Sequence, residues 1–271
     1  MITNNMQSIK SISIIGSGNI ANHLGVEFYK LGFNIEFVFS RNGIEGKKLA
    51  KKLNAQYLSI GEINCEKSSH LLLIAISDDS IEALLSKIDK TEIIIAHTSG
   101  SVSSTVFSNK FNNYGVLYPL QTFTKNTILD FKQIPFFVFG SNKLVEKKLI
   151  ELSNVLSEMV EIMDDLKRQK LHIAAIFANN FSNHLFALSE QYCKENDLKF
   201  EQLKPLIAAT FEKINNNISP FNAQTGPASR GDMNTIMNHL NTLKDSKIKH
   251  LESIYTLLSA SILNLHTQPK G

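Results

Sequence analysis

Short apolar runs alternate with amphipathic stretches along the first half of the chain. Six of these runs predict strands, and several are almost continuously apolar: residues 11–16, 34–40, 71–77, 92–97, 114–119 and 135–140. Parallel strands that helices cover on both faces have this pattern. The first half therefore predicts a doubly wound α/β sheet.

The pattern changes after Asp164, where β-branched runs give way to long amphipathic segments. Helices are predicted near residues 166–196, 200–217, 233–243 and 247–266. No Gly/Ser-rich or Pro-rich tract separates the two halves. We therefore expect two domains without a flexible linker, at residues 1–163 and 164–271.

Composition narrows the range of partners. The 271 residues are 43% hydrophobic and carry a formal charge of +3, with the basic residues spread along the chain. This distribution is unlike a nucleic-acid-binding stripe, so no nucleic acid partner is expected. Without a secretion signal or an apolar run of membrane-spanning length, we expect a cytoplasmic protein with no membrane partner.

The two cysteines, Cys65 and Cys193, lie far apart in the sequence and have no C-x-x-C spacing. That spacing argues against a zinc site, a redox motif or a disulfide framework. We expect two ordinary packed thiols and no bound metal.

A glycine turn follows the first predicted strand and opens a helix. Gly16 permits a tight turn, Gly18 lets the backbone approach a pyrophosphate, and Ala21 allows close packing of helix on sheet. The free N–H groups at the helix start, around Asn19 and Ile20, would hold the pyrophosphate. The alternative is a glycine turn that binds nothing.

The end of the second predicted strand indicates which dinucleotide is bound. An Asp or Glu there usually accepts from a free ribose 2′-hydroxyl, whereas this chain has Ser40 and Arg41. Arg41 can bind a 2′-phosphate bidentately and Ser40 can donate a hydrogen bond to it. We therefore expect NADP(H), the alternative being that Arg41 is a solvated loop residue.

A polar turn also follows the third predicted strand, at Ser77 and Asp78. This turn is expected to lie along the coenzyme at the carboxyl edge of the sheet. Asp78 or Asp79 could instead cap the helix that begins near Ser80.

These elements together resemble the NADP-binding domain that pyrroline-carboxylate reductase, prephenate dehydrogenase and the deazaflavin-dependent NADP oxidoreductases share. The segments IIGSGNIA, FSRN and AISDDSI carry the resemblance. With the later HTSGS, YPLQTF and TGPASRGD, the whole chain resembles a family of Rossmann-like NADP oxidoreductases with a helical C-terminal domain. The resemblance implies a helical domain of the 6-phosphogluconate-dehydrogenase C-terminal type, which commonly forms homodimers.

Residues just after the later strands should face the nicotinamide and a small-molecule substrate. Ser99 and Gly100 could contact the nicotinamide or the substrate at a helix start, and His97 could donate or accept a proton. The alternative is that Ser99 or Ser101 is only an N-cap and that His97 is a core histidine. Gln121 follows the next strand, and Tyr118 stands where prephenate dehydrogenase has a histidine, so the same substrate is not expected.

The first long C-terminal helix carries a polar stripe. A step of 100° per residue brings His172, Asn179, Asn183 and Glu190 onto one side. In the related dehydrogenases this helix supplies a Lys and an Asn to the substrate, and the resemblance points to His172 and Asn180. The helical wheel favours Asn179, so the choice between the two asparagines stays open.

Arg230 lies in a turn between two predicted helices, directly before the expected N-cap Asp232. It could clamp a substrate carboxylate or phosphate, or pair with Asp232 and hold the loop.

The sequence thus predicts an NADP(H)-dependent oxidoreductase that transfers a hydride to or from a small carbonyl or imine. His172 is the expected general acid and base, with Asn180 and Ser99 orienting the substrate. An imine reductase of the pyrroline-carboxylate type and a non-catalytic NADP(H)-binding protein are the alternatives.

Overall fold

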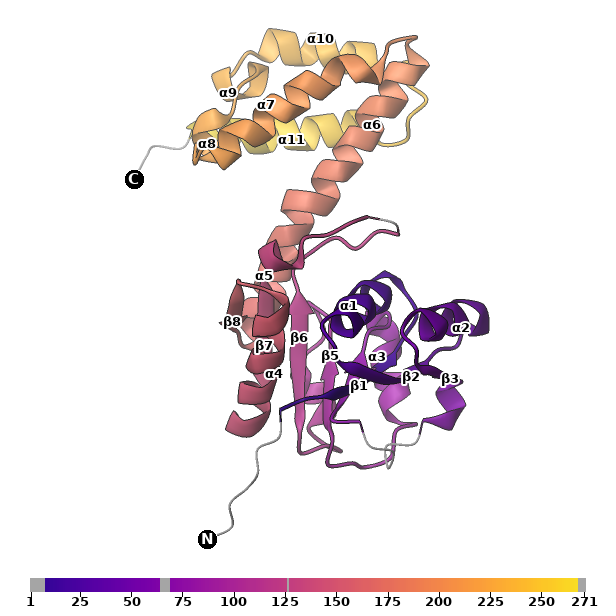
Figure 1. Ribbon diagram of the computed structural model, residues 1–271. Helices are drawn as coiled ribbons and strands as arrows, with labels where there is room; N and C mark the ends of the chain where they lie inside the picture. The colour runs from indigo at the N-terminus through magenta and orange to yellow at the C-terminus, as the bar shows by residue number, and fades with distance from the viewer. Residues whose placement is uncertain (1–7, 64–68, 126, 268–271) are drawn as a thin grey trace. The chain divides into compact units, whose positions relative to one another are not determined.

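The computed structural model describes residues 8–63, 69–125 and 127–267. The chain divides into two compact units (Figure 1): the first extends to Ile176 and the second begins at Phe177. The expected domain boundary lay earlier, after residue 163. The difference is helix α5 (Asp165–Ala175), whose Leu171 packs against buried residues of the sheet and which therefore belongs to the first unit.

The described residues of the first unit form an eight-stranded sheet in the order β3-β2-β1-β4-β5-β6-β7-β8. Its strands are β1 (Ser11–Ile15), β2 (Asn34–Phe39), β3 (Gln56–Leu58), β4 (Leu71–Ile74), β5 (Ile94–His97), β6 (Tyr114–Pro119), β7 (Phe136–Gly140) and β8 (Val160–Ile162). Neighbouring strands are parallel except for the antiparallel pair β6 and β7. All six predicted strands are present, and the doubly wound α/β fold is confirmed. The two strands that were not predicted, β3 and β8, lie at the edges of the sheet.

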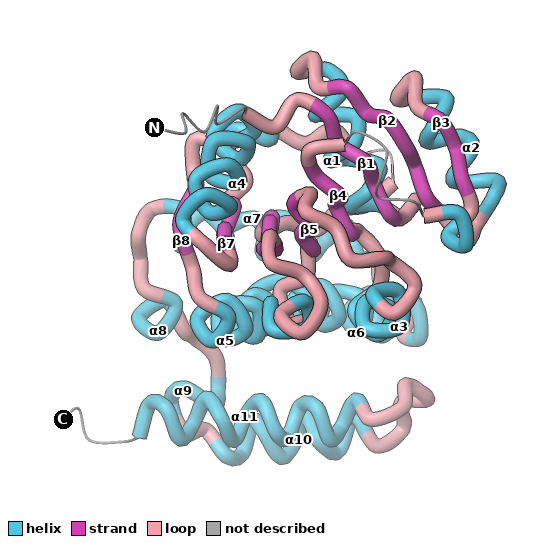
Figure 2. Tube along the Cα trace, turned by 90° about the horizontal axis from the view of Figure 1, so that it is seen from below, coloured by secondary structure: helices cyan, strands magenta, loops and turns pink. Residues whose placement is uncertain are grey.

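Helices cover both faces of the sheet (Figure 2). On one face, α1 (Asn19–Lys30), α2 (Gly43–Lys52) and α4 (Lys143–Leu156) pack on inward-pointing strand residues such as Ile12, Ile14 and Leu73. On the other face, α3 (Ile81–Leu85) packs on Leu72 and Ile74, and α5 packs beside β6 and β7. Successive strand side chains alternate between two buried faces, which explains why the strands are continuously apolar.

Strand β1 lies at the point where the strand order reverses. Ile15, its last residue, pairs with Phe39 of β2 on one side and with Ile74 of β4 on the other. The chain leaves these three strands in neighbouring turns, and ligands of open α/β sheets bind in the crevice outside such a point. Short 3-10 helices follow several of the strands: η1 (Ile60–Glu62), η2 (Asp78–Ser80), η3 (Ser104–Phe107) and η4 (Phe131–Gln133).

The described part of the second unit is helical, as predicted. Its helices are α6 (Ser182–Glu195), η6 (Phe200–Leu203), α7 (Lys204–Asn215), α8 (Pro220–Ala223), α9 (Pro227–Arg230), α10 (Met233–Leu243) and α11 (Leu251–Thr267). The helix predicted at 166–196 is interrupted, because a π-helix, η5 (Ile176–Phe181), joins α5 to α6. In a π-helix the hydrogen bonds run from i to i+5, so each residue advances by less than 100°. The wheel that grouped His172 with Asn179 therefore does not hold across this turn.

Few side chains of the second unit are buried. Among its described residues, the buried ones are Leu188, Cys193, Ala228 and Ile236. Cys193 is a free, packed thiol, as expected, whereas Cys65 lies outside the described residues.

The described helices include none that is long and apolar enough to cross a membrane. Within the same residues, no group of three His, Cys, Asp or Glu side chains is placed to hold a metal ion.

Candidate functional site

The glycine turn has the geometry that a phosphate-binding loop needs. Gly16 has a φ of +123°, and a Cβ there would collide with the carbonyl group of Ala75. Its N–H donates to the carbonyl of Phe39 at 2.8 Å, which ties the turn to the end of β2. Gly18 is the N-cap of α1. The space next to its Cα is open, because no described atom lies within 4 Å of a Cβ built on it. No side chain caps α1, so its first N–H groups are available to an anion.

A cavity of about 390 Å³ lies beside this turn. Six of the residues predicted to bind the coenzyme line it: Gly16, Gly18, Ile20, Ser40, Arg41 and Ser77. Their convergence follows from the topology, because the ends of β1, β2 and β4 are neighbours at the switch point.

Ser40 and Arg41 differ in how freely they can meet a ligand. Ser40 is 4% exposed, and its hydroxyl lies 2.7 Å from that of Ser17 and accepts from the N–H of Asn42 at 3.1 Å. The Asn42 side chain caps α2, accepting from the N–H groups of Ile44 and Glu45. Arg41 is exposed and lines the cavity, so its guanidinium can reach an anion there.

Asn19 and Asp78 use their side chains to connect loops. The Asn19 amide donates to the carbonyl of Phe123 at 2.9 Å, so only its backbone remains for a phosphate. Neither Asp78 nor Asp79 caps η2 or α3, which removes that alternative. The Asp78 carboxylate instead accepts a hydrogen bond from the hydroxyl of Ser101, joining the turns after β4 and β5.

The turn after β5 buries its two predicted site residues. His97 is 0% exposed, stacks on Phe107 with ring centroids 5.5 Å apart, and accepts from the N–H of Ser99 at Nδ1. Its Nε2 has no partner of normal hydrogen-bond geometry among the described residues. Burial, reinforced by the charge of Arg168, lowers the pKa of His97 to about 4, so the ring is neutral. This position fits the alternative of a core histidine.

Ser99 shapes the turn. It is 7% exposed, and its hydroxyl oxygen accepts from the N–H groups of Ser101 at 3.1 Å and Val102 at 3.0 Å. These bonds lie within the turn and cap no helix, because the N-cap of η3, the next helix along the chain, is Ser103. Its predicted role in orienting a substrate stays a prediction.

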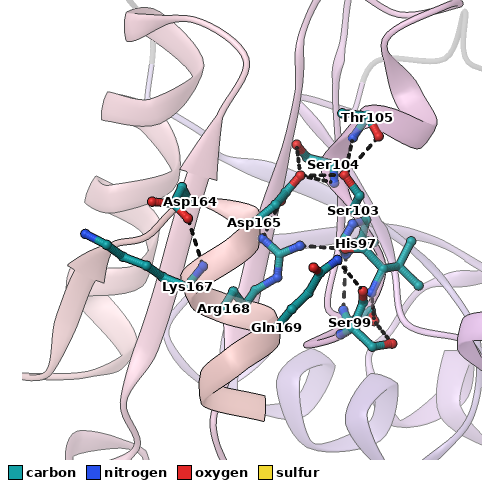
Figure 3. A network of polar contacts seen from close by, with 12 residues as sticks. His97, Ser99, Ser103, Ser104, Thr105, Asp164, Asp165, Lys167, Arg168 and Gln169 are labelled. Carbon is teal, nitrogen blue, oxygen red and sulfur yellow. Dashed lines mark hydrogen bonds and ion pairs between the residues drawn. The ribbon is translucent and has the colours of Figure 1, made fainter. Parts of the chain in front are cut away.

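A buried ion pair fastens α5 to this turn (Figure 3). Arg168 Nη1 lies 2.7 Å from Asp165 Oδ1, and Nη2 donates to the carbonyl of Val102 at 2.5 Å. Asp165 Oδ2 accepts from the hydroxyl of Ser103 at 2.6 Å and from both the N–H and the hydroxyl of Ser104. Burial raises the pKa of Asp165, but these hydrogen bonds and the Arg168 charge outweigh it, and the net pKa lies below the usual value.

His172 follows Arg168 by four residues on α5 and meets Tyr118 of β6. The Tyr118 hydroxyl lies 3.0 Å from Nδ1 of His172, and the two rings are 5.9 Å apart in an edge-to-face arrangement. Gly100 lies against both rings, since a Cβ on it would be 2.6 Å from Nδ1 of His172. Turn, strand and helix therefore converge on His172 at the carboxyl edge of the sheet.

The remaining predicted residues lie elsewhere. Gln121 is exposed, and its side chain accepts from the N–H of Thr122 at 2.8 Å. Asn179 and Asn180 are exposed residues of the π-helix in the second unit. Arg230 ends α9 and is exposed beside Asp232, which caps α10 as predicted. The substrate roles of these four residues stay predictions.

Sequence reasoning did not assign roles to Tyr118 or Arg168. Tyr118 carried a usable signal, because it follows a strand at the carboxyl edge where a related family has a histidine. Arg168 carried none, because an arginine in the first turn of a predicted helix is ordinarily solvated.

The chain is similar to a known protein family and to solved structures. Residues 134–262 match the family model described as "Domain of unknown function (DUF2520)". The crystal structure of a "putative NADP oxidoreductase" from Bacteroides fragilis is 37% identical in sequence, with a TM-score of 0.87 over 96% of this chain and 100% of that one. No curated protein matches the sequence.

More distant structures share the fold. A reductive aminase from Aspergillus terreus, solved with NADPH, is 14% identical, with a TM-score of 0.68 over 95% of this chain and 93% of that one. A 1-pyrroline-5-carboxylate reductase from Streptococcus pyogenes is 12% identical, with a TM-score of 0.57 over 95% of this chain and 98% of that one. An imine reductase from Myxococcus stipitatus, a V8 variant in complex with NAD⁺, is 15% identical, with a TM-score of 0.64 over 96% of this chain and 93% of that one.

Proposed function

Because this chain belongs to the family of Rossmann-like NADP-binding oxidoreductases that includes the Bacteroides fragilis protein, we propose that it is an NADP(H)-dependent oxidoreductase. Its substrate is a small carbonyl or imine compound. The observation that carries the proposal is the cavity beside the Gly16 turn, in which six residues predicted from the sequence come together.

The residues present fit a dinucleotide. Gly16 has a backbone conformation that side chains rarely adopt, and Gly18 leaves open space where the backbone must approach a pyrophosphate. The uncapped N-terminus of α1 supplies N–H donors and a favourable helix dipole for the phosphates. A bound nicotinamide would supply hydride transfer.

The preference for NADP(H) over NAD(H) rests on the end of β2. The cavity is lined there by Arg41, Ser40 and Asn42, so no carboxylate occupies the position from which one would repel a 2′-phosphate. Arg41 is exposed and can bind the phosphate bidentately. A charge-assisted contact of this kind contributes about 1.5–3 kcal/mol, or about 10- to 100-fold in affinity.

His172 is the proposed proton donor and acceptor. Its Nδ1 is engaged by Tyr118, and Nε2 has no hydrogen-bond partner among the residues that the structure describes. The pair Asp165 and Arg168 holds α5 and so keeps the ring at the sheet edge, where the nicotinamide end of a dinucleotide lies in open α/β folds. Imidazole is suited to this role because one ring nitrogen can donate or accept a proton while the other is held by a hydrogen bond.

Calorimetric titration with NADPH and, separately, NADH tests the proposal. Wild-type protein should bind NADPH more tightly, and Arg41→Ala should lose about 10- to 100-fold of NADPH affinity with little change for NADH. Lys51→Ala is the matched control, since Lys51 is an exposed cation of α2 that does not line the cavity. If neither coenzyme binds, the proposal fails.

Turnover assays with aldehydes, ketones and cyclic imines then separate the substrate classes. Oxidation of NADPH with cyclic imines alone would identify an imine reductase. Tight NADPH binding without turnover of any class would favour the non-catalytic binding protein.

A further inference from the structure

Tyr118 and His172 form a hydrogen-bonded pair in which Tyr118 is packed among apolar residues of the sheet. Tyr118 is 7% exposed and belongs to a cluster with Val116 and Phe137. Its hydroxyl has His172 Nδ1, at 3.0 Å, as its one hydrogen-bond partner within the described part of the chain. A buried hydroxyl that lost this partner would be left without a hydrogen bond, which is unfavourable.

The turn after β5 accommodates this pair closely. A Cβ on Gly100 would lie 2.6 Å from Nδ1 of His172 and 2.8 Å from Cζ of Tyr118. Both distances are shorter than real Cβ contacts, so any larger residue would push the two rings apart. Glycine at this position is therefore a requirement of the pair.

Helix α5 cannot easily turn to release His172. Gln169 donates to the carbonyl of Ser101 at 2.9 Å, and Arg168 donates to that of Val102. These residues precede His172 by three and four positions, which places all three on neighbouring parts of one helix surface. The hydrogen bonds of Arg168 and Gln169 thus fix the helix backbone that carries His172, and Tyr118 fixes the ring at Nδ1.

We infer that Tyr118 is a positioning residue for His172: its hydroxyl holds Nδ1 in both charge states of the ring and leaves Nε2 to exchange a proton with the substrate. The inference rests on the proposed function for the substrate, although the pairing itself does not depend on a coenzyme.

A phenol suits this task because it can both donate and accept. Burial raises the pKa of Tyr118 to about 12, so the phenol keeps its proton. When His172 is neutral, the hydroxyl donates to Nδ1, which gives both polar groups a partner and puts the ring proton on Nε2. When His172 is protonated, the phenol oxygen accepts from Nδ1–H. A carboxylate could only accept, so it would pair only with a ring that carries a proton on Nδ1.

The proton balance of a reduction follows. As a hydride reaches the substrate carbon from NADPH, the Nε2–H bond of the imidazolium breaks and an O–H or N–H bond forms on the substrate. The ring is left neutral with its remaining proton on Nδ1, which donates to the phenol oxygen, and water then returns a proton to Nε2. Oxidation uses this same Nδ1–H tautomer, reached from the Nε2–H tautomer by proton exchange with water, and in it the bare Nε2 accepts the proton from the substrate.

Nitrogen-15 NMR of the His172 ring tests the inference without coenzyme or substrate. At a pH where the ring is neutral, the wild-type spectrum should show one tautomer, with Nε2 protonated and Nδ1 bare. In Tyr118→Phe, both nitrogens should shift toward the values of a mixed population. Gly100→Ala should produce a similar shift while keeping the hydroxyl, because its Cβ displaces the ring.

Tyr114→Phe is the matched control, since Tyr114 is on the same strand and has no contact with His172. Its spectrum should match wild type, and thermal unfolding of each variant identifies any that is misfolded. An averaged tautomer in the wild type, or an unchanged one in folded Tyr118→Phe, would overturn the inference. Failure of wild-type protein to bind NADPH would instead overturn the proposed function, and the two outcomes are read from different experiments.

Discussion

Replacing Arg168 by methionine should destabilise the first unit far more than any other loss of a cation from α5. The Arg168 side chain is 1% exposed, and its partner Asp165 is 21% exposed. Methionine keeps much of the apolar volume of the arginine stem, so the change removes chiefly the charge and its donors. It leaves the Asp165 carboxylate without its counter-ion and the carbonyl of Val102 without its donor.

The expected loss in the free energy of unfolding depends on the hydrogen bonds that Asp165 keeps in the variant. Removing one partner of a fully buried ion pair costs about 3–5 kcal/mol. Asp165 keeps its three hydrogen bonds from Ser103 and Ser104 and some contact with water, so we expect a smaller loss of about 2–4 kcal/mol. For a protein of this size, that corresponds to a fall in the melting temperature of about 5–10 °C.

Thermal and denaturant unfolding, followed by circular dichroism, measure this change. Lys167→Met is the matched control, because Lys167 lies on the exposed side of the same helix and points away from the ion pair in Figure 3. Its free energy of unfolding should stay within about 0.5 kcal/mol of wild type. Asp165→Asn strands the arginine charge instead, so the double variant should cost less than the sum of the single ones.

The stability that Asp165 contributes depends on pH in a definite direction. The pKa of Asp165 is lowered by folding, so its contribution is present above the unfolded value, near pH 4, and is lost as the pH falls through the lower folded value. The difference between wild type and Arg168→Met should therefore shrink in acid. Equal stabilities of Arg168→Met and Lys167→Met at neutral pH would refute this account of the ion pair.

Three further predictions concern other parts of the molecule. Gly16→Ala forces a side chain into a positive φ and against the Ala75 carbonyl, so calorimetry should detect no NADPH binding and unfolding should show a loss of at least about 1–3 kcal/mol; wild-type affinity would contradict the proposed role of the turn. The pKa of His97 falls from 6.5 to about 4 on folding, so stability should be complete above about pH 6.5 and decline by about 3 kcal/mol toward pH 4, whereas His97→Gln should lack this decline in denaturant titrations at matched pH. The second unit exposes many large apolar side chains: Leu206, Phe211, Ile214, Phe221, Met237, Leu257 and Leu258. Light scattering should therefore give a homodimer of twice the 30.3 kDa chain mass, and a monomer at micromolar concentration would contradict the predicted dimer.

Strands were predictable where two buried faces made a run of apolar residues. Ile12, Ile14 and Ile15 are fully buried, and the run is visible in the sequence because both faces of the strand are covered, so apolar residues occupy successive positions as well as alternate ones. The edge strands β3 and β8 span three residues each, too few to show a period against a polar background. They form by pairing with β2 and β7, the strands beside them in the sheet.

The helix through 166–196 was predictable as a helix but not in its register. A 100° step assumes i to i+4 hydrogen bonding throughout, and the segment Ile176–Phe181 departs from it. Nothing in the composition of IFANNF distinguishes a π-helix from an α-helix. The choice between Asn179 and Asn180 therefore could not be made from a wheel.

The two halves of the candidate site differ in how far the sequence reveals them. Gly16 and Gly18 act through the local backbone, and Ser40 and Arg41 follow a strand that pairs with β1, so motif and topology together predict the coenzyme cavity. The half around His172 is assembled from distant parts of the chain, because Tyr118 meets His172 across 54 positions and Arg168 meets Val102 across 66.

Each of these long-range contacts ends on or beside the turn after β5. The carbonyl of Ser101 accepts a hydrogen bond from Gln169 of α5, and its hydroxyl donates to Asp78 in the turn after β4. Gly100 lies against the Tyr118–His172 pair. A turn with so many fixed contacts cannot move without shifting His172. The burial of His97 and Ser99 is therefore consistent with a supporting role: they shape the turn that sets where His172 stands, and the substrate need not touch them.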